Sequence, residues 1–282
     1  MISDTDLLSL NQKGFIPGPQ EDEQGFLNRV DRLRQISAEQ MLSLKEPIVE
    51  DDWKGAQILT HELFDVSTDW VPGFYSNKQL PFWQGAAAWI CDTEDGIKLP
   101  VLQLKRTFKK HHHLGIYSLD EVLAHEALHA SRMMFDEPKF EEFLAYRTSK
   151  SVLRKWFGPL FRSSWESYFF VFMLLVPLGV QITRLFIADN SVMDALFYLP
   201  WLLIGIGLLR LLRTHYTFAQ CEKNICPCLK HLDRSQAVLF RLTDKEISLF
   251  AKMKPNEIRQ YIRAQRKNSL RWRLLSLAYF SP

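Results

Sequence analysis

Two uncharged, apolar stretches in the second half of the chain constrain its fold more than any other feature. Residues 167–183 carry no charged side chain over 17 positions, and residues 195–209 form a second such run of 15. The second run is longer if Arg210 snorkels to the headgroups. Both runs approach the roughly 20 residues with which a helix crosses a bilayer, and neither has a polar stripe. We therefore predict a transmembrane hairpin over residues 167–213, with a buried helical pair and a re-entrant hairpin as alternatives.

The basic residues around these stretches predict how the hairpin is oriented. Lys150, Arg154, Lys155 and Arg162 precede the first stretch, Arg210, Arg213 and Lys223 follow the second, and between them the basic residue is Arg184. Because basic flanks stay in the cytoplasm, we expect an integral membrane protein whose N- and C-terminal domains are cytoplasmic. Residues 148–166 mix basic with aromatic side chains, which is typical of a segment at the bilayer surface.

A segment before the hairpin reads His-Glu-Ala-Leu-His, which is the pattern H-E-x-x-H, with its histidines at His125 and His129. On a helix, side chains four positions apart share a face, so both imidazoles can bind one metal ion. Glu126 would lie beside the open position of that ion and could act as general base toward a Zn2+-activated water. Ser118 and Glu121 have the spacing of a capping box, which predicts that the helix begins at Ser118.

The next predicted helix offers a carboxylate as third ligand, either Glu141 or Glu142. If the chain reverses over residues 134–137, His129 and Glu142 each lie about five residues from the turn, or roughly 7.5 Å along their helix axes. The two side chains would then lie level with each other. We favour Glu142 because the small Ala145 follows it by one turn and allows the helices to approach closely; Glu141 is the alternative.

These two motifs, His125-Glu126-x-x-His129 and Glu142-x-x-Ala145, resemble those of the gluzincin metallopeptidases. The membrane-bound enzymes with a second motif Glu-x-x-Ala-Asp are the most similar, although Tyr146 stands where they have aspartate and the spacing between the motifs is short. The resemblance covers about a fifth of the chain. It implies a zinc cofactor, a glutamate as third ligand, and a protein or peptide substrate.

A β-hairpin is predicted over residues 86–104, upstream of this helix. An apolar run, residues 86–91, is followed by a Thr-Glu-Asp-Gly turn and by a second run with alternating polarity. Pro100 would place the second strand at the edge of a sheet. An edge strand beside the metal helix could bind an extended substrate by strand addition, although it could equally be an ordinary sheet edge.

Hydrolysis through a tetrahedral intermediate also requires a hydrogen-bond donor for the oxyanion. Three residues near the motifs are candidates: Tyr146, Tyr117 and His113. His113 ends a basic, histidine-rich segment, residues 109–113, which we interpret mainly as a solvated loop. Nothing in the sequence distinguishes among the three candidates.

The two ends of the chain are predicted to be helical. In residues 1–47, apolar residues recur at helical spacing from Phe26 onward, and residues 214–282 carry a net charge of +8 against −5 for the remainder. The anionic surface of the bilayer is the expected partner for this charge, and no nucleic acid is expected because no base-reading motif is present. We interpret Cys221, Cys226 and Cys228 as free thiols; a metal site with His231 and lipidation are the alternatives.

Together these features predict an α+β fold in five parts. They are a helical N-terminal arm (1–47), a zincin-like catalytic domain with a small sheet and the H-E-x-x-H helix (48–147), a basic interfacial segment (148–166), a two-helix transmembrane hairpin (167–213) and a basic helical cytoplasmic domain (214–282). The predicted function is that of a membrane-anchored zinc-dependent endopeptidase. The alternative is a non-enzymatic membrane scaffold with an incidental or structural metal site. The sequence predicts no oligomeric state.

Overall fold

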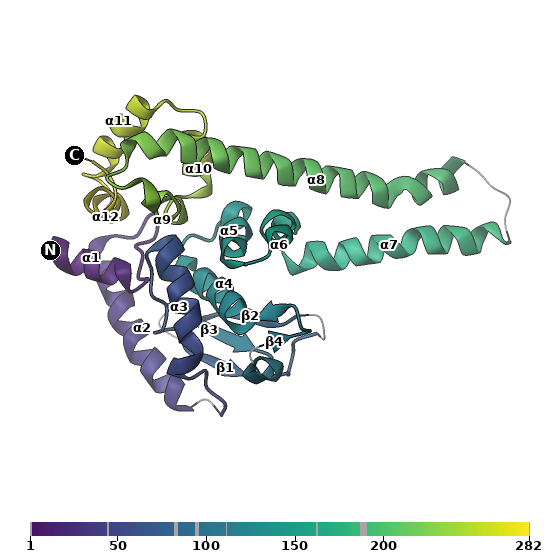
Figure 1. Ribbon diagram of the computed structural model, residues 1–282, viewed down its shortest axis with the longest axis horizontal. Coiled ribbons are helices and arrows are strands. Elements are labelled where there is room, and N and C mark those ends of the chain that lie inside the picture. Colours follow the sequence, from purple (N-terminus) through teal and green to yellow (C-terminus); the bar gives the residue numbers. More distant parts are fainter. Residues whose placement is uncertain are drawn as a thin grey trace.

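The computed structural model describes residues 2–43, 45–81, 84–93, 96–110, 112–161, 163–186 and 191–281. Most of these residues are helical, and a small sheet lies among the helices. Two long helices, α7 (Ser164–Arg184) and α8 (Ser191–Ile225), project side by side from the body of the protein (Figure 1). The predicted small sheet among helices and the predicted pair of long apolar helices are confirmed.

The sheet contains the predicted hairpin. Strands β2 (Ala86–Asp92) and β3 (Lys98–Leu104) pair in antiparallel register from Ala86 opposite Leu104 to Asp92 opposite Lys98. Strand β1 (Gly73–Tyr75) runs parallel to β3 on its other side, so the order is β1-β3-β2. Two residues of the predicted turn, Glu94 and Asp95, lie outside the described residues.

The expectation that Pro100 marks an edge strand is wrong, because β3 is the central strand and β2 lies at the edge. The backbone explains how a proline is accommodated there. The N–H of Leu102 points toward β1, where it donates to the carbonyl of Pro72 (2.8 Å), so the nitrogen of Pro100 faces the same side. Strand β1 pairs only with residues 102–104. Pro100 therefore lies beyond the end of β1, at a position that requires no N–H donor.

Helix α4 (Leu119–Arg132) carries the H-E-x-x-H motif and begins where predicted. The Oγ of Ser118 accepts the N–H of Glu121 at 3.4 Å, as expected of an N-cap. The carboxylate of Glu121 does not complete a reciprocal capping box, because it accepts the N–H of Lys150 (2.6 Å) and pairs with Arg154 (2.8 Å). The first turn of α4 is therefore held by the segment that precedes the hairpin.

The remaining elements complete the body. They are α1 (Asp4–Gln12), α2 (Glu23–Ser43), α3 (Glu50–Phe64), β4 (His112–His113), β5 (Tyr117–Ser118), α5 (Pro138–Ala145), α6 (Val152–Phe157), α9 (Ser235–Phe240), α10 (Asp244–Phe250), α11 (Pro255–Gln265) and α12 (Leu270–Ala278). Short 3-10 turns lie at Arg106–Lys110, Tyr146–Thr148, Gly158–Leu160, Cys226–Cys228 and Leu232–Arg234.

The N- and C-terminal helices pack against each other and against α4. The side-chain amide of Asn11 donates to the hydroxyl of Tyr279 (3.0 Å) and its carbonyl accepts the Nε of the fully buried Arg241 (2.6 Å). Arg132, at the end of α4, donates to the backbone carbonyl of Phe240. The helical arm and the C-terminal helices thus share contacts, and both support the helix that carries the metal motif.

A buried ion pair joins α10 to α12. The guanidinium of Arg271 donates to both oxygens of Glu246, at 2.7 and 2.9 Å, and the indole N–H of Trp272 donates to one of them at 2.8 Å. Burial alone would raise the pKa of Glu246, but the charge and hydrogen bonds of Arg271 hold it below its ordinary value. The carboxylate is therefore ionised in the folded protein at neutral pH.

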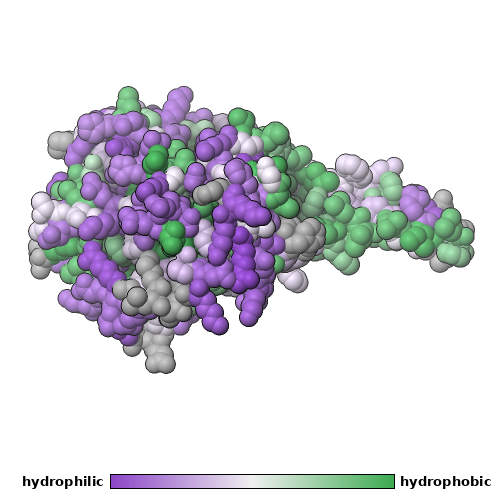
Figure 2. Space-filling model, turned by 60° about the horizontal axis from the view of Figure 1, so that its bottom comes forward, coloured by the Kyte–Doolittle hydropathy of each residue, from purple (hydrophilic) through white to green (hydrophobic). Residues whose placement is uncertain are grey.

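Helices α7 and α8 are long and apolar enough to cross a membrane. In their most apolar windows only 6% and 11% of the residues are buried, whereas the core helix of a water-soluble protein would be mostly buried. Figure 2 shows apolar side chains over this projecting part of the molecule. Helix α8 continues past the predicted boundary at residue 213, and its last turns enter the core, where Phe218, Cys221 and Ile225 are fully buried.

Candidate metal centre

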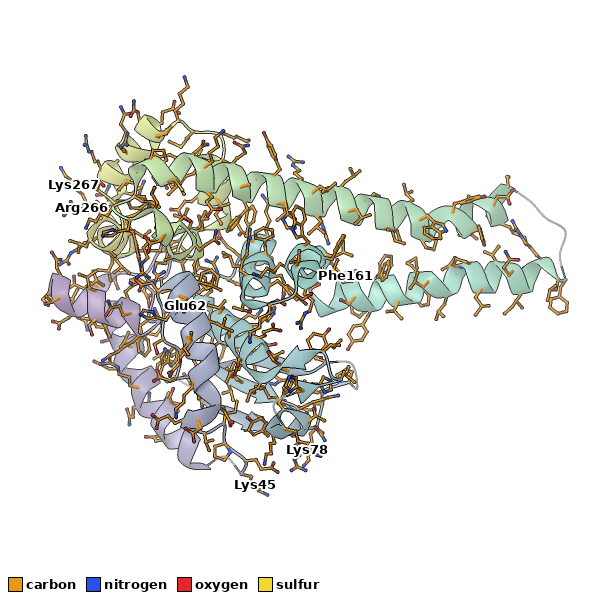
Figure 3. All side chains as sticks on the ribbon, in the orientation of Figure 1. Lys45, Glu62, Lys78, Phe161, Arg266 and Lys267 are labelled. Carbon is orange, nitrogen blue, oxygen red and sulfur yellow. The ribbon has the colours of Figure 1, made fainter. Side chains whose placement is uncertain are left out.

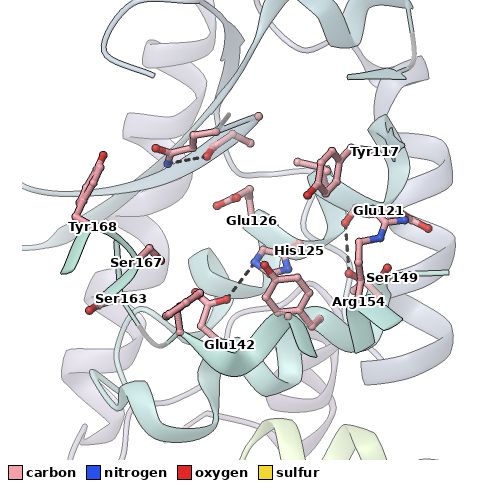
Figure 4. Close-up of a pocket in the computed structure, with 18 of the residues that line it drawn as sticks. Tyr117, Glu121, His125, Glu126, Glu142, Ser149, Arg154, Ser163, Ser167 and Tyr168 are labelled. Carbon is pink, nitrogen blue, oxygen red and sulfur yellow. Dashed lines mark hydrogen bonds and ion pairs between the residues drawn. The ribbon is translucent and has the colours of Figure 1, made fainter. Parts of the chain in front are cut away.

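Three side chains from two helices form a cluster that could hold a metal ion: His125 and His129 of α4, and Glu142 of α5. The Nε2 atoms of the two imidazoles lie 3.4 Å apart. The carboxylate oxygens of Glu142 lie 3.5 Å from the Nε2 of His125 and 3.6 Å from the Nε2 of His129 (Figure 4). Within the described part of the chain, no second group of three or more His, Cys, Asp or Glu side chains meets in this way.

Helix α5 is fixed at its start by two features, one local and one distant. Pro138 occupies its first position, where no N–H is required. The backbone N–H groups of Lys139 and Phe140 donate to the carboxylate of Asp244 on α10, at 2.9 and 3.2 Å. This distant carboxylate satisfies two orphan donors of α5 and so sets how the helix presents Glu142 to α4.

Glu141, the alternative third ligand, lies on the far side of the His129 ring. Its Oε1 is 2.8 Å from the Nδ1 of His129, while the Nε2 of the same ring faces the cluster. A carboxylate that accepts the Nδ1–H of a ligating histidine fixes the ring orientation and its tautomer. The structure thus gives the two neighbouring glutamates different positions, Glu142 in the cluster and Glu141 behind it.

The charges around the cluster favour a cation. Burial alone would lower the pKa of His129, but the hydrogen bond to Glu141 and the charges of Glu142 and Glu126 raise it to about 9. Burial would raise the pKa of Glu142, yet hydrogen bonding to His125 and the two imidazoles hold it below its ordinary value. A metal ion bound between these groups would displace the imidazole proton and compensate the same carboxylate charge.

Glu126 lies next to the cluster but is not part of it. Its side chain lines the same cavity as His125 and Glu142 (Figure 4). Burial raises the pKa of Glu126, although the two imidazoles and the backbone N–H of Ala88, on the outer edge of β2, oppose that rise. A carboxyl group with a raised pKa can both accept a proton and return it near neutral pH.

The three oxyanion candidates take different positions. Tyr146 and Tyr117 line the cavity, whereas His113 is buried in β4, with its Nδ1 2.8 Å from the hydroxyl of Thr107. The ring centroid of Tyr146 is 4.7 Å from that of His125. A Cβ at Gly158 would come within 2.3 Å of the Tyr146 ring, so glycine is required for this placement. Tyr146 is thus the candidate beside the cluster.

The cavity has a volume of about 700 Å3. Apart from the predicted site residues, its walls include Arg154, Phe161, Ser167, Tyr168 and Val171. Arg154 pairs with Glu121 and lies 5.0 Å from the ring centre of Tyr117. Phe161 precedes α7 (Figure 3), and the last three residues belong to α7 itself. None of these five residues was predicted in the site, because the H-E-x-x-H pattern identifies site residues only on its own helix.

The cysteines of the C-terminal part do not join a metal-ligand cluster within the described residues. Cys221 and Cys228 are buried and Cys226 is half-buried, and none of the three forms a disulfide within the described residues. The Sγ of Cys228 donates to the backbone carbonyl of Pro255 at 3.4 Å. These thiols contribute to packing around the end of α8.

Replacing Glu141 with alanine tests its supporting position. We expect the affinity for zinc to fall about 10- to 100-fold, as is typical when the partner of a ligating histidine is removed, while the metal still binds at saturating zinc. Isothermal titration calorimetry on the detergent-purified protein measures this change. Glu62→Ala, at an exposed position of α3 (Figure 3), is the matched control. Complete loss of binding in Glu141→Ala would instead make Glu141 a ligand.

Comparison with known protein families, curated proteins and solved structures finds no match to this chain.

Proposed function

We propose that this protein is a membrane-anchored, zinc-dependent endopeptidase with a zincin-like catalytic core. The observation that carries the proposal is the clustering of His125, His129 and Glu142 at a cavity whose wall includes Glu126, the acid–base residue of the H-E-x-x-H pattern. The geometry of these four side chains supports hydrolysis by an activated water.

The donor set fits zinc. Two imidazole nitrogens and one carboxylate are the ligands of many catalytic zinc sites, and three protein ligands leave a position for water or substrate. Magnesium and calcium prefer sets made of oxygen atoms. The hydrogen bond between His129 and Glu141 adds the outer support that ligating histidines require.

A bound zinc ion would polarise the scissile carbonyl and make a water molecule acidic enough to react near neutral pH. Glu126 would accept the proton of that water and then deliver it to the amine of the leaving group. The hydroxyl of Tyr146, beside His125, would donate a hydrogen bond to the oxygen on which negative charge develops. Burial and the charge of Glu142 raise the pKa of Tyr146, so this hydroxyl keeps its proton.

The position of β2 supports an extended substrate. β2 is the edge strand of its sheet, and its N–H at Ala88 faces the side of Glu126. From Trp89 onward the strand is exposed. A peptide added along this edge would be held by hydrogen bonds to its main chain. Such bonds do not depend on the side chains of the peptide, so they allow an endopeptidase to accept many sequences.

The membrane location is part of the proposal. We propose that α7 and α8 span the bilayer, with the body of the protein on the cytoplasmic side, as the distribution of basic residues predicts. Arg266 and Lys267 of the basic C-terminal region lie at the end of the body farthest from the hairpin (Figure 3). Their position gives no support to the expectation that the C-terminal charge binds the same bilayer.

Chelation and reconstitution test the proposal on the intact protein. The purified protein in detergent should cleave a labelled unfolded protein such as casein, lose this activity in a zinc chelator, and regain it with added zinc but not with magnesium. Cleavage is followed by release of labelled peptides. If the zinc-loaded protein leaves casein intact, the endopeptidase proposal fails and the scaffold alternative gains support.

A further inference from the structure

The cavity lined by His125 and Glu142 of the cluster has the first turns of α7 as another of its walls. Ser167, Tyr168 and Val171 line it. Val171 lies four residues after Ser167 and three after Tyr168, spacings that place side chains on one face of a helix. In Figure 4, Ser167 and Tyr168 lie on the opposite side of the cluster from Tyr117. The exposed fractions of Tyr168 and Val171 are 45% and 59%, so α8 does not cover this face of α7.

An ion pair marks the level at which α7 leaves the body of the protein. Glu166 accepts two hydrogen bonds from Arg210 of α8, at 2.7 and 2.8 Å, and Arg210 also donates to the carbonyl of Leu160 at 2.7 Å. Beyond Glu166, α7 has no charged residue before Arg184. Val171 lies five residues past Glu166, or about 7.5 Å along the axis. The cavity therefore extends into the uncharged part of α7.

Helix α6, which precedes α7, presents large apolar side chains to the outside. Val152, Leu153, Trp156 and Phe157 are all about half exposed or more. Arg154 and Lys155 lie among them. A short helix with exposed aliphatic and aromatic residues beside basic ones suits the boundary between headgroups and acyl chains. With α7 and α8 in the bilayer as proposed above, the part of the cavity bounded by Arg154 of α6 and by α7 would open at the level of the lipid surface.

We propose that the preferred substrate is the segment of a membrane-anchored protein that directly adjoins its transmembrane span. This inference rests on the proposed function and narrows it. The span of the substrate would lie in the bilayer beside the exposed face of α7. The adjoining segment would pass Tyr168 in extended form and reach the cluster and the edge of β2.

The cost of an unpaired backbone explains why the cut falls beside the span and not within it. In hydrocarbon, each unpaired N–H or C=O costs several kcal/mol, so a span remains helical and its peptide bonds stay inaccessible. At the bilayer surface, water and the outer edge of β2 can satisfy an extended chain. The site is therefore suited to residues that have just left the hydrocarbon.

The test uses the zinc-loaded protein in vesicles of phosphatidylcholine and phosphatidylglycerol. One unstructured, cleavable segment is presented in three forms: directly beside a transmembrane helix, separated from it by a rigid helical spacer of about 30 residues (about 45 Å), and as a free peptide. We expect the adjacent form to be cleaved at least about tenfold faster than the others at equal concentration, because its anchor holds the segment at the cavity.

A pair of matched variants tests the wall formed by α7. Val171→Trp places a larger side chain in the cavity beside α7. Val192→Trp makes the same change on α8, at an exposed position that does not line the cavity. We expect Val171→Trp to lower the ratio of the adjacent-form rate to the free-peptide rate, and Val192→Trp to leave this ratio at its wild-type value. An equal change of the ratio in both variants would overturn the assignment of this wall.

The rates of the three forms test the substrate preference and the endopeptidase activity separately. Equal rates for the three forms, all abolished by Glu126→Gln, would overturn the substrate preference and leave the endopeptidase proposal intact. No cleavage of any form by the wild-type protein would overturn both.

Discussion

Replacing Glu126 with glutamine is expected to lower the rate of peptide-bond hydrolysis about 100- to 10,000-fold, the contribution typical of a positioned general base. Glutamine preserves the size of the side chain but cannot take up the proton of the attacking water. Because Glu126 is not one of the three clustered ligands, the variant should bind as much zinc as the wild type. Casein cleavage and zinc content are measured on the same purified sample.

Glu62→Gln serves as the control. Glu62 is exposed on α3 and does not line the cavity, so this variant makes the same glutamate-to-glutamine change away from the site. It should cleave and bind zinc like the wild type. A Glu126→Gln variant with full activity would exclude Glu126 as the base. Zinc bound equally by wild type and variant, with no turnover in either, would support the non-enzymatic scaffold with a structural metal site.

Replacing Arg271 with methionine is expected to destabilise the folded protein by about 3–5 kcal/mol, because it leaves Glu246 buried without its guanidinium partner. Thermal unfolding in detergent, followed by circular dichroism, measures the loss. The comparison variant Arg266→Met makes the same substitution at an exposed position directly after α11 and should be nearly neutral.

The same variant has a predicted dependence on pH. In the wild type, the pKa of Glu246 is lower in the folded than in the unfolded protein, where it is near 4.5. Its contribution is therefore fully present above about pH 4.5 and is lost as the pH falls through the folded value. In Arg271→Met, burial without the guanidinium raises the pKa of Glu246, so the variant takes up this proton at a higher pH than the wild type, and the difference in stability between the two should shrink on acidification. A constant difference would show that Glu246 is not the group that Arg271 stabilises.

The parts of the site that follow from the sequence are those fixed by local geometry. His125, Glu126 and His129 share one helix, so the helical repeat alone places the two imidazoles together. The position of Glu142 follows from the short connection after α4, which keeps the two helices level. The sequence could offer the adjacent Glu141, which is hydrogen-bonded to His129, only as an alternative ligand. Which carboxylate faces the cluster depends on the rotation of α5, and Asp244, about a hundred residues later, helps to set that rotation.

The features that the sequence did not predict depend on distant contacts. Tyr168 and Val171 line the cavity because the first turns of α7 form one of its walls, and no local sequence pattern predicts that arrangement. Asn11 is hydrogen-bonded to Tyr279, although the two residues lie near opposite ends of the sequence. The predicted division into separate N- and C-terminal regions therefore missed the packing between these regions. The strand order was likewise hidden, since the short β1 that makes β3 central has only three residues.

The most direct test of the account is the metal content of the purified protein, measured by plasma emission spectrometry after incubation with zinc and removal of the excess. We expect about one zinc ion per chain in the wild type, since one cluster of three ligands is present among the described residues. We also expect loss of that ion in His129→Ala and in Glu142→Ala, and its retention in Glu62→Ala. A wild-type protein without zinc, or a Glu142→Ala variant that keeps all of it, would contradict the account.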